Sequence, residues 1–150
     1  YKDYSKTKEK IITLKKLIDQ FPKEWKLCHI DANCDNFLFY KDNGKEKLKL
    51  IDWEYAAMQD PHLDIAMFCI YSMYDRKQVD HLIDIYFNHE CDKQIRIKIY
   101  CYISICGLLW SNWCEYKHTL GVEFGEYALA QYAFAKDYYD IVVEEMGELQ

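Results

Sequence analysis

The chain has 150 residues, with 19 basic and 25 acidic side chains and a formal net charge of −6. This length suits one domain, and a content of 51% hydrophobic and 29% charged residues is typical of a globular protein. The acidic balance argues against a nucleic-acid partner, because such proteins need basic surfaces to bind phosphates. The aromatic content of 17% indicates a use for aromatic side chains beyond filling the core.

The seven cysteines form no Cys-x-x-Cys pair, and most of them lie inside apolar runs. We therefore expect buried free thiols in a reducing, cytoplasmic setting. A zinc site is the alternative, since His89 and Cys91 are close in sequence, but a four-ligand spacing is missing. The polar first residues indicate no signal peptide. The longest uncharged apolar stretch, residues 99–112, is shorter than the ~20 residues that span a bilayer, so we expect a buried helix there and no membrane insertion.

Apolar residues spaced three and four apart predict an amphipathic helix over residues 4–20. Phe21-Pro22 ends it, because the residue before a proline disfavours the helical conformation. Residues 25–30 then predict a short buried strand. The chain is therefore expected to open with one helix that leads into a β region.

Residues 37–40 and 48–51 predict two further strands. Asn43-Gly44 lies between them, and this dipeptide is a strong signal for a tight hairpin turn. Either a phosphate-binding patch or the solvated face of a hairpin explains the nearby lysines, and the second is favoured: Lys45, Lys47 and Lys49.

After Asp52 the pattern predicts four helices. Asp60-Pro61 suits an N-cap followed by proline at the first helical position, in a helix that runs to about Tyr74. Asp75 caps the next helix, and the last two are expected over residues 93–117 and 124–146. The expected fold class is α+β and mainly helical, with a small hairpin-bearing β region between helices.

The pattern His-x-Asp-x-x-x-x-Asn, formed by His29, Asp31 and Asn36, lies between two predicted strands, and Asp52 follows the hairpin at a strand end. The hairpin would bring the Asp52 carboxylate back beside the Asn36 amide, and such oxygen ligands suit Mg²⁺. The Asp31 carboxylate can accept a proton from a hydroxyl. This is the layout for phosphoryl transfer from Mg·ATP to an alcohol. Asp-rich turns or a core histidine would explain each piece alone, but the whole pattern favours the functional interpretation.

These residues carry a resemblance to a known family. Residues 29–36 and 51–56 resemble the catalytic and metal-binding motifs of choline/ethanolamine kinases, within the aminoglycoside-phosphotransferase and protein-kinase-like group. Residues 60–66 are similar to the segment that follows in bacterial choline kinases of the LicA type. The resemblance implies a protein-kinase-like C-terminal lobe that covers residues 1–150 and whose small hairpin region carries the catalytic loop.

The resemblance also implies roles for single residues. Asp31 would be the catalytic base, and Asn36 and Asp52 would hold Mg²⁺ and thereby the co-substrate ATP. His29, within the catalytic loop, and Asp64 would brace that loop, with Glu54 as further structural support. Choline kinases usually carry Asn at the position of Ile30, so we expect altered hydrogen bonding in the loop and not lost catalysis.

Trp110 and Trp113 lie three residues apart, on one face of a predicted helix. From the spacing alone an aromatic pair in the core is favoured, but aromatic faces also bind quaternary ammonium groups by cation–π attraction. The resemblance implies that both tryptophans form a choline pocket with Phe124 and Tyr127. Tyr71 would be another aromatic wall, where some relatives carry an acid, and this departure weakens the choice of choline over other amino alcohols.

Only the C-terminal part of the family is matched. No Gly-rich loop and no lysine-bearing strand precede the catalytic loop. We therefore expect the N-terminal nucleotide lobe to be missing, weak ATP binding by the chain alone, and an uncovered apolar face that favours a homodimer. Three functions stay open: a kinase of choline or a related amino alcohol, an inactive module that binds quaternary amines, and a kinase of an aminoglycoside or another small alcohol.

Overall fold

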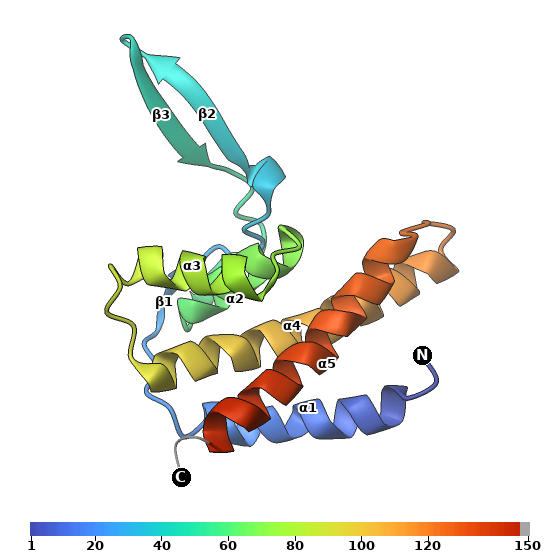
Figure 1. Cartoon of the computed structure of the whole chain (residues 1–150). Helices are drawn as coiled ribbons and strands as arrows, with labels where there is room; N and C mark the ends of the chain where they lie inside the picture. The colour runs from blue at the N-terminus through green and yellow to red at the C-terminus, as the bar shows by residue number, and fades with distance from the viewer. Residues whose placement is uncertain (148–150) are drawn as a thin grey trace.

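The computed structural model describes residues 1–147, and helices make up most of it (Figure 1). Between the first and second helices lie four short strands and one 3₁₀ turn, η1 (Cys34–Asn36). The helices are α1 (Tyr4–Ile18), α2 (His62–Tyr71), α3 (Arg76–Tyr86), α4 (Lys93–Thr119) and α5 (Glu126–Gly147). The strands are β1 (Lys26–Cys28), β2 (Phe37–Asp42), β3 (Lys45–Leu50) and β4 (Ala57–Gln59).

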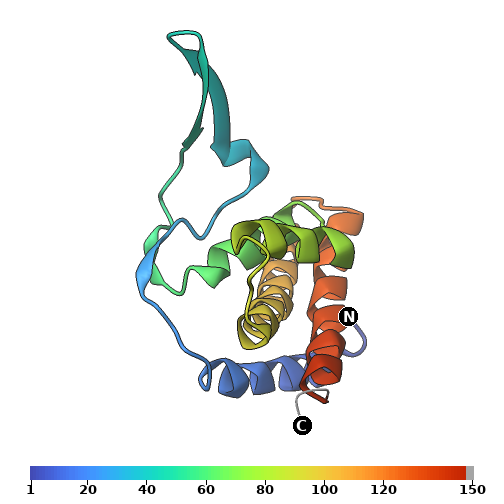
Figure 2. The ribbon, with the colours of Figure 1, turned by 60° about the vertical axis from the view of Figure 1, so that its left-hand side comes forward.

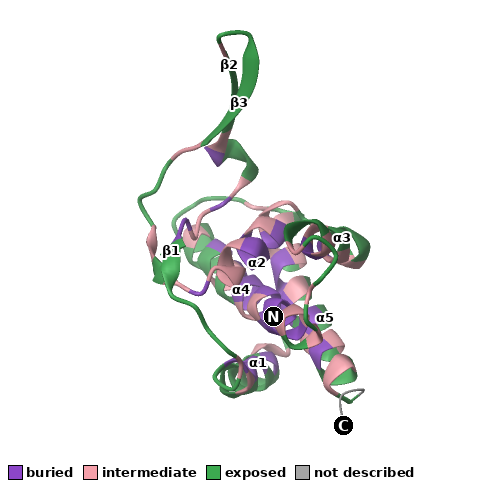
Figure 3. Ribbon diagram, turned by 90° about the vertical axis from the view of Figure 1, so that its left-hand side faces the viewer, coloured by how far each residue is buried: buried purple, intermediate pink, exposed green. Residues whose placement is uncertain are grey.

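Helix α4 is the centre of the helical body, with α1, α2 and α5 packed against it. Its 27 residues include the expected buried stretch, which supplies fully buried side chains such as Ile99 and Ile103. Figure 3 shows that the buried residues gather where α2, α4 and α5 face one another. Burial of these apolar faces stabilises the fold, since each fully buried Ile or Leu side chain contributes about 1.5–3 kcal/mol.

Gly107 lets α4 and α5 approach closely. A Cβ atom at this position would lie 2.8 Å from Gln131 O and 2.9 Å from Ala135 N, which are backbone atoms of α5. Three residues earlier in α4, the Ser104 hydroxyl donates to Ala135 O at 2.6 Å. The two helices are therefore in backbone contact at this crossing.

The predicted hairpin is confirmed: β2 and β3 pair in antiparallel register from Phe37 opposite Leu50 to Asp42 opposite Lys45. Asn43 and Gly44 both have positive φ, 51° and 75°, as a two-residue hairpin turn requires. The hairpin projects from the helical body (Figures 1 and 2), and large apolar side chains on it are exposed: Leu38, Phe39, Tyr40 and Leu48. These four residues are called the hairpin patch below.

Several predicted boundaries are wrong. The strand expected over residues 25–30 is shorter, since β1 covers only Lys26–Cys28, and two of its three residues are exposed. It pairs with β4, a strand that the sequence pattern did not predict. Helix α2 ends at Tyr71 and not near Tyr74, because Met73 takes a left-handed conformation with φ of 54°. Pro61 was expected to be the first helical residue of α2, but it precedes that residue, His62. Helix α5 begins at Glu126 and not at residue 124 as expected. Asp75 caps α3 as predicted.

A buried ion pair joins the β region to α4. Lys98 is 1% exposed and donates to Asp60 Oδ2 at 2.8 Å and to Pro22 O at 2.6 Å. Asp60 Oδ1 also accepts from the backbone N–H of His62 at 3.1 Å, but the N-cap of α2 is Pro61 and not Asp60 as predicted. The pair fixes β4 and the segment after α1 against the central helix.

Within residues 1–147 the seven cysteines are free thiols, five of them buried. His89 and Cys91 belong to no group of three or more potential His, Cys, Asp or Glu metal ligands in this range. Among the described helices, none is both long enough and apolar enough to cross a membrane.

Candidate active site

The loop between β1 and η1 is held by its neighbours. The Asp64 carboxylate, at the start of α2, accepts from the N–H groups of His29 at 2.9 Å and Ile30 at 2.7 Å. His29 is 1% exposed, and its Nε2 lies 2.7 Å from Ile51 O, next to the end of β3. Its ring also packs edge-on against Trp53, with centroids 4.8 Å apart. The loop is thereby tied both to α2 and to the hairpin.

The Asp31 carboxylate is fixed by three side chains. Tyr71 OH donates to Oδ1 at 2.6 Å, and the side-chain amides of Asn33 and Asn36 each donate to Oδ2 at 3.2 Å. The Asn36 amide also donates to the Asp31 backbone O at 2.9 Å. Burial raises the pKa of Tyr71, and the adjacent Asp31 carboxylate raises it further, so the phenol keeps its proton and acts as the donor.

Asn36 and Asp52 come from chain positions that lie side by side. Ile51 N donates to Asn36 O at 3.0 Å, which extends the hairpin register by one pair, and Asp52 is the next residue. Both Asn36 amide bonds to Asp31 use Nδ2, so Oδ1 is left free, and the exposed Asp52 carboxylate bonds to no described residue. Two available oxygen donors fit Mg²⁺, which keeps several waters when it binds to proteins.

A cleft with a volume of about 580 Å³ opens on Asp31. It brings together six of the residues singled out from the sequence: Asp31, Glu54, Tyr71, Trp110, Trp113 and Tyr127. The other predicted site residues do not line this cleft. His29 and Asp64 lie behind the loop, and Asn36 and Asp52 lie at the base of the hairpin. Phe124 also lies outside the cleft.

The cleft wall opposite the loop is aromatic. Trp110 and Trp113 stack with centroids 5.0 Å apart and planes at 11°, and Tyr71 meets Trp110 edge-on, also at 5.0 Å. Phe124 packs on Trp113 at 5.4 Å and lines a separate hollow beyond it. Burial also raises the pKa of Tyr127, so this phenol, like that of Tyr71, keeps its proton.

Sequence reasoning missed four residues that line the cleft: Asn33, Cys34, Asp35 and Tyr55. All four lie inside the two motif segments, and this position in the sequence could have indicated them. The sequence does not show that their side chains point into the cleft. Glu54 was expected to give structural support, yet it lines the cleft and makes no hydrogen bond to any residue from 1 to 147. Together with Asp31 and Asp35, it gives the cleft three carboxylates.

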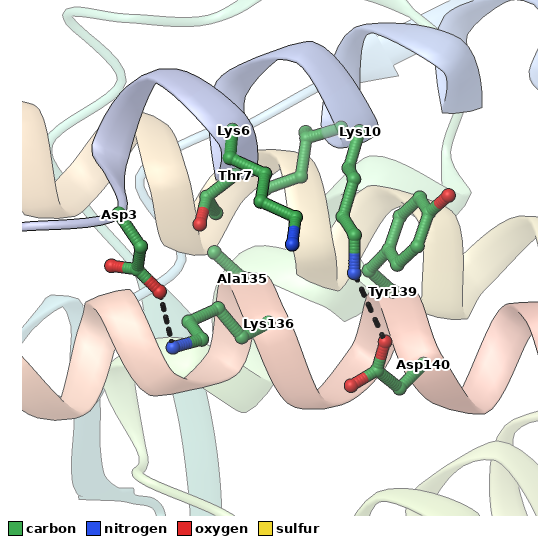
Figure 4. Close-up of a pocket in the computed structure, with 9 residues that line it drawn as sticks. Asp3, Lys6, Thr7, Lys10, Ala135, Lys136, Tyr139 and Asp140 are labelled. Carbon is green, nitrogen blue, oxygen red and sulfur yellow. Dashed lines mark hydrogen bonds and ion pairs between the residues drawn. The ribbon is translucent and has the colours of Figure 1, made fainter.

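A second cavity, of about 160 Å³, lies between α1 and α5 (Figure 4). Ion pairs bridge it on both sides, from Lys136 to Asp3 at 2.6 Å and from Lys10 to Asp140 at 3.8 Å. None of the motif residues lines it. The cleft beside Asp31 is therefore the candidate active site.

The sequence model of choline/ethanolamine kinases matches residues 2–90. The chain belongs to the choline/ethanolamine kinase family. Over 110 residues it is 34% identical to the protein LicA of Haemophilus influenzae, an alignment that covers 68% of this chain and 39% of that protein.

Solved structures agree with this family. A crystal structure of the choline kinase LicA from Streptococcus pneumoniae superposes with a TM-score of 0.75 at 29% identity, over 93% of this chain and 48% of that one. A LicA structure in complex with AMP gives 0.76 at 28% identity, over 95% of this chain and again 48% of that one. A choline/ethanolamine kinase family protein from Mesorhizobium loti, at 24% identity and a TM-score of 0.69, shares the fold.

The fold of this chain is thus that of the choline/ethanolamine kinase family. The predicted fold class, a mainly helical α+β fold like the C-terminal lobe of a protein kinase, is confirmed. The chain spans about half the length of each of the two LicA structures. It matches a smaller share, 39%, of the Haemophilus protein. The roles assigned to single residues of the choline/ethanolamine kinase site stay predictions.

Proposed function

We propose that this chain supplies the catalytic loop and the acceptor site of a phosphotransferase that moves the γ-phosphoryl group of ATP to the hydroxyl of choline or a related amino alcohol. The observation that carries this proposal is the cleft in which a fixed carboxylate, Asp31, faces a stacked pair of tryptophans, Trp110 and Trp113. The aromatic wall suits a cation, and the carboxylate suits a hydroxyl.

In this proposal the quaternary ammonium group of the acceptor lies against the aromatic wall. Such a group has no N–H to donate, so it is attracted by ring faces, each contributing about 0.5–2 kcal/mol. Trp113 is 38% exposed, and its ring already attracts one cation, the Lys117 ammonium 5.4 Å from the ring centroid. Asp35 and Glu54 add negative charge at the same cleft and would stabilise the cation further.

Asp31 would orient the acceptor hydroxyl and take its proton as the oxygen attacks phosphorus. Asn36 Oδ1 and the Asp52 carboxylate would hold Mg²⁺, which neutralises phosphate charge when bound. ATP as the phosphoryl donor is supported by the family and by the LicA structure solved with AMP.

We also propose that nucleotide binding needs an N-terminal lobe outside these residues, because the part matched is about half of each LicA structure. The exposed hairpin patch supports this, since uncovered apolar surface often marks an interface. A homodimer through the same patch, and a cytoplasmic location, stay predictions.

A second acceptor class has support in the structure. Aminoglycosides carry several ammonium groups and hydroxyls, and the three carboxylates of the cleft would pair with such groups. Turnover of a panel that contains choline, ethanolamine and an aminoglycoside separates the two classes. A module that only binds quaternary amines would bind choline and form no phosphorylated product.

The test is phosphorus NMR of the full-length gene product incubated with Mg·ATP and choline. We expect phosphocholine to form, and Asp31→Asn to lower kcat by about 10²–10⁴-fold, the usual contribution of a general base. Choline binding, followed by calorimetry, should survive the substitution because the aromatic wall is intact. Undiminished turnover in Asp31→Asn would remove Asp31 from the role of base.

A further inference from the structure

We propose that Tyr71 is a positioning residue that aims one oxygen of Asp31, Oδ1, at the acceptor hydroxyl and at the same time forms part of the cation wall. This inference rests on the proposed function, which assigns the base and the wall but gives Tyr71 only an aromatic role. Its phenol donates to Asp31 Oδ1 at 2.6 Å, and its ring packs edge-on against Trp110 with centroids 5.0 Å apart.

The hydrogen bonds of Asp31 decide which of its oxygens is open. A carboxylate has about four lone-pair positions, two on each oxygen. Oδ2 accepts from both the Asn33 and the Asn36 amides, so its positions are occupied. Oδ1 accepts only from Tyr71, so one position remains there. The acceptor hydroxyl would therefore donate to Oδ1, beside the phenol.

The phenol also sets the direction of that free position. Asn33 and Asn36 hold the carboxylate on one side, and Tyr71 holds it on the other, so the plane of the group is fixed. Tyr71 belongs to the last turn of α2, and its ring is braced by Trp110 of α4. One side chain thereby links the place of the hydroxyl to the place of the ammonium group.

The test compares two cations that differ only in the hydroxyl. Choline and ethyltrimethylammonium are titrated calorimetrically into the full-length gene product, its Tyr71→Phe variant and a control, Tyr74→Phe. The control removes a hydroxyl three residues away that makes no hydrogen bond to a described residue and lies outside the cleft. Tyr71→Phe keeps the ring and loses only the donor.

We expect the wild-type chain to prefer choline over ethyltrimethylammonium. In Tyr71→Phe this preference should fall by about tenfold, because choline loses a well-placed hydrogen bond from its hydroxyl to the charged Asp31 carboxylate. The affinity for ethyltrimethylammonium, which has no hydroxyl, should stay unchanged. Tyr74→Phe should keep both affinities. The hydroxyl-specific change is what a merely structural role of Tyr71 would not produce.

Three results would overturn the inference. A preference that is unchanged or larger in Tyr71→Phe would show that the phenol does not position Asp31. If the substitution weakens the binding of both cations equally, Tyr71 only supports the structure or the aromatic wall. If neither cation binds to the wild-type chain, the proposed acceptor site itself fails, and the inference fails with it.

Discussion

Ile30 occupies a backbone conformation that branched side chains rarely adopt. Its φ is 70°, in the left-handed region, where a β-branched residue costs of order 1–2 kcal/mol relative to favourable residues. The bond from its N–H to Asp64 holds this conformation in place. Asn tolerates the left-handed region, so the Asn that the resemblance leads us to expect at this position would fit this backbone.

Replacing Ile30 by Asn should therefore stabilise the chain. We expect the free energy of unfolding to rise by about 1 kcal/mol, measured by urea denaturation. Ile30→Val is the matched control, because it keeps the branched Cβ and the strain, and it should give no gain. Equal stability of the Asn and Val variants would show that the left-handed backbone is not the cause.

His62 makes stability depend on pH. Burial, with the Lys98 ammonium nearby, lowers the pKa of His62 below its ordinary value of 6.5, and Asp60 offsets this only in part. As pH falls through 6.5, the unfolded chain takes up a proton that the folded chain does not, so the free energy of unfolding decreases.

A His62→Gln variant should lose less stability than the wild type between pH 7 and pH 5. The comparison uses urea midpoints of both proteins at the two pH values, and the difference between their changes isolates this one group. If the two proteins respond to pH identically, His62 binds its proton as readily folded as unfolded.

At the scale of elements, the α4–α5 crossing depends on Gly107. Gly107→Ala would place a methyl group 2.8 Å from a backbone oxygen, so the helices must separate, at a cost of about 1–3 kcal/mol. Gly147→Ala is the control, since nothing lies within 4 Å of its Cβ position and Ala favours helix. Thermal unfolding should show a lower Tm for Gly107→Ala only, and an unchanged Tm there would contradict the close approach.

Elements with strong local signals were predictable from the sequence. The Asn43-Gly44 turn, the Asp75 cap and the long apolar run of α4 each specify their structure through nearby residues. The β1–β4 pair could not be predicted, because each strand has three residues and they pair across the intervening hairpin. The end of α2 was missed because a left-handed Met73 leaves no mark in the pattern.

The same distinction holds for the candidate site. The motif residues come from one loop and one strand end, so their spacing predicted a common location. The composition of the cleft depends on how α2, α4 and α5 are placed around that loop, and a single sequence does not show this. The bond from Tyr71 to Asp31, which spans 40 residues, and the direction of Glu54 into the cleft are the main examples.

At the scale of the whole molecule, the fold separates two tasks. The helical body carries the aromatic wall of the cleft on α2, α4 and α5, while the base of the hairpin carries Asn36 and Asp52. The loop that carries Asp31 joins the two parts, held by Asp64 on one side and by Ile51 on the other. A cation and a nucleotide would therefore approach Asp31 from different sides.

The most direct measurement is a crystal structure of the full-length gene product with choline, Mg²⁺ and a non-hydrolysable ATP analogue. The account predicts the ammonium group against Trp110 and Trp113, the hydroxyl within hydrogen-bond distance of Asp31 Oδ1, and the metal on Asn36 and Asp52. Choline bound away from the tryptophan pair, or a metal held without either of its two predicted ligands, would contradict it.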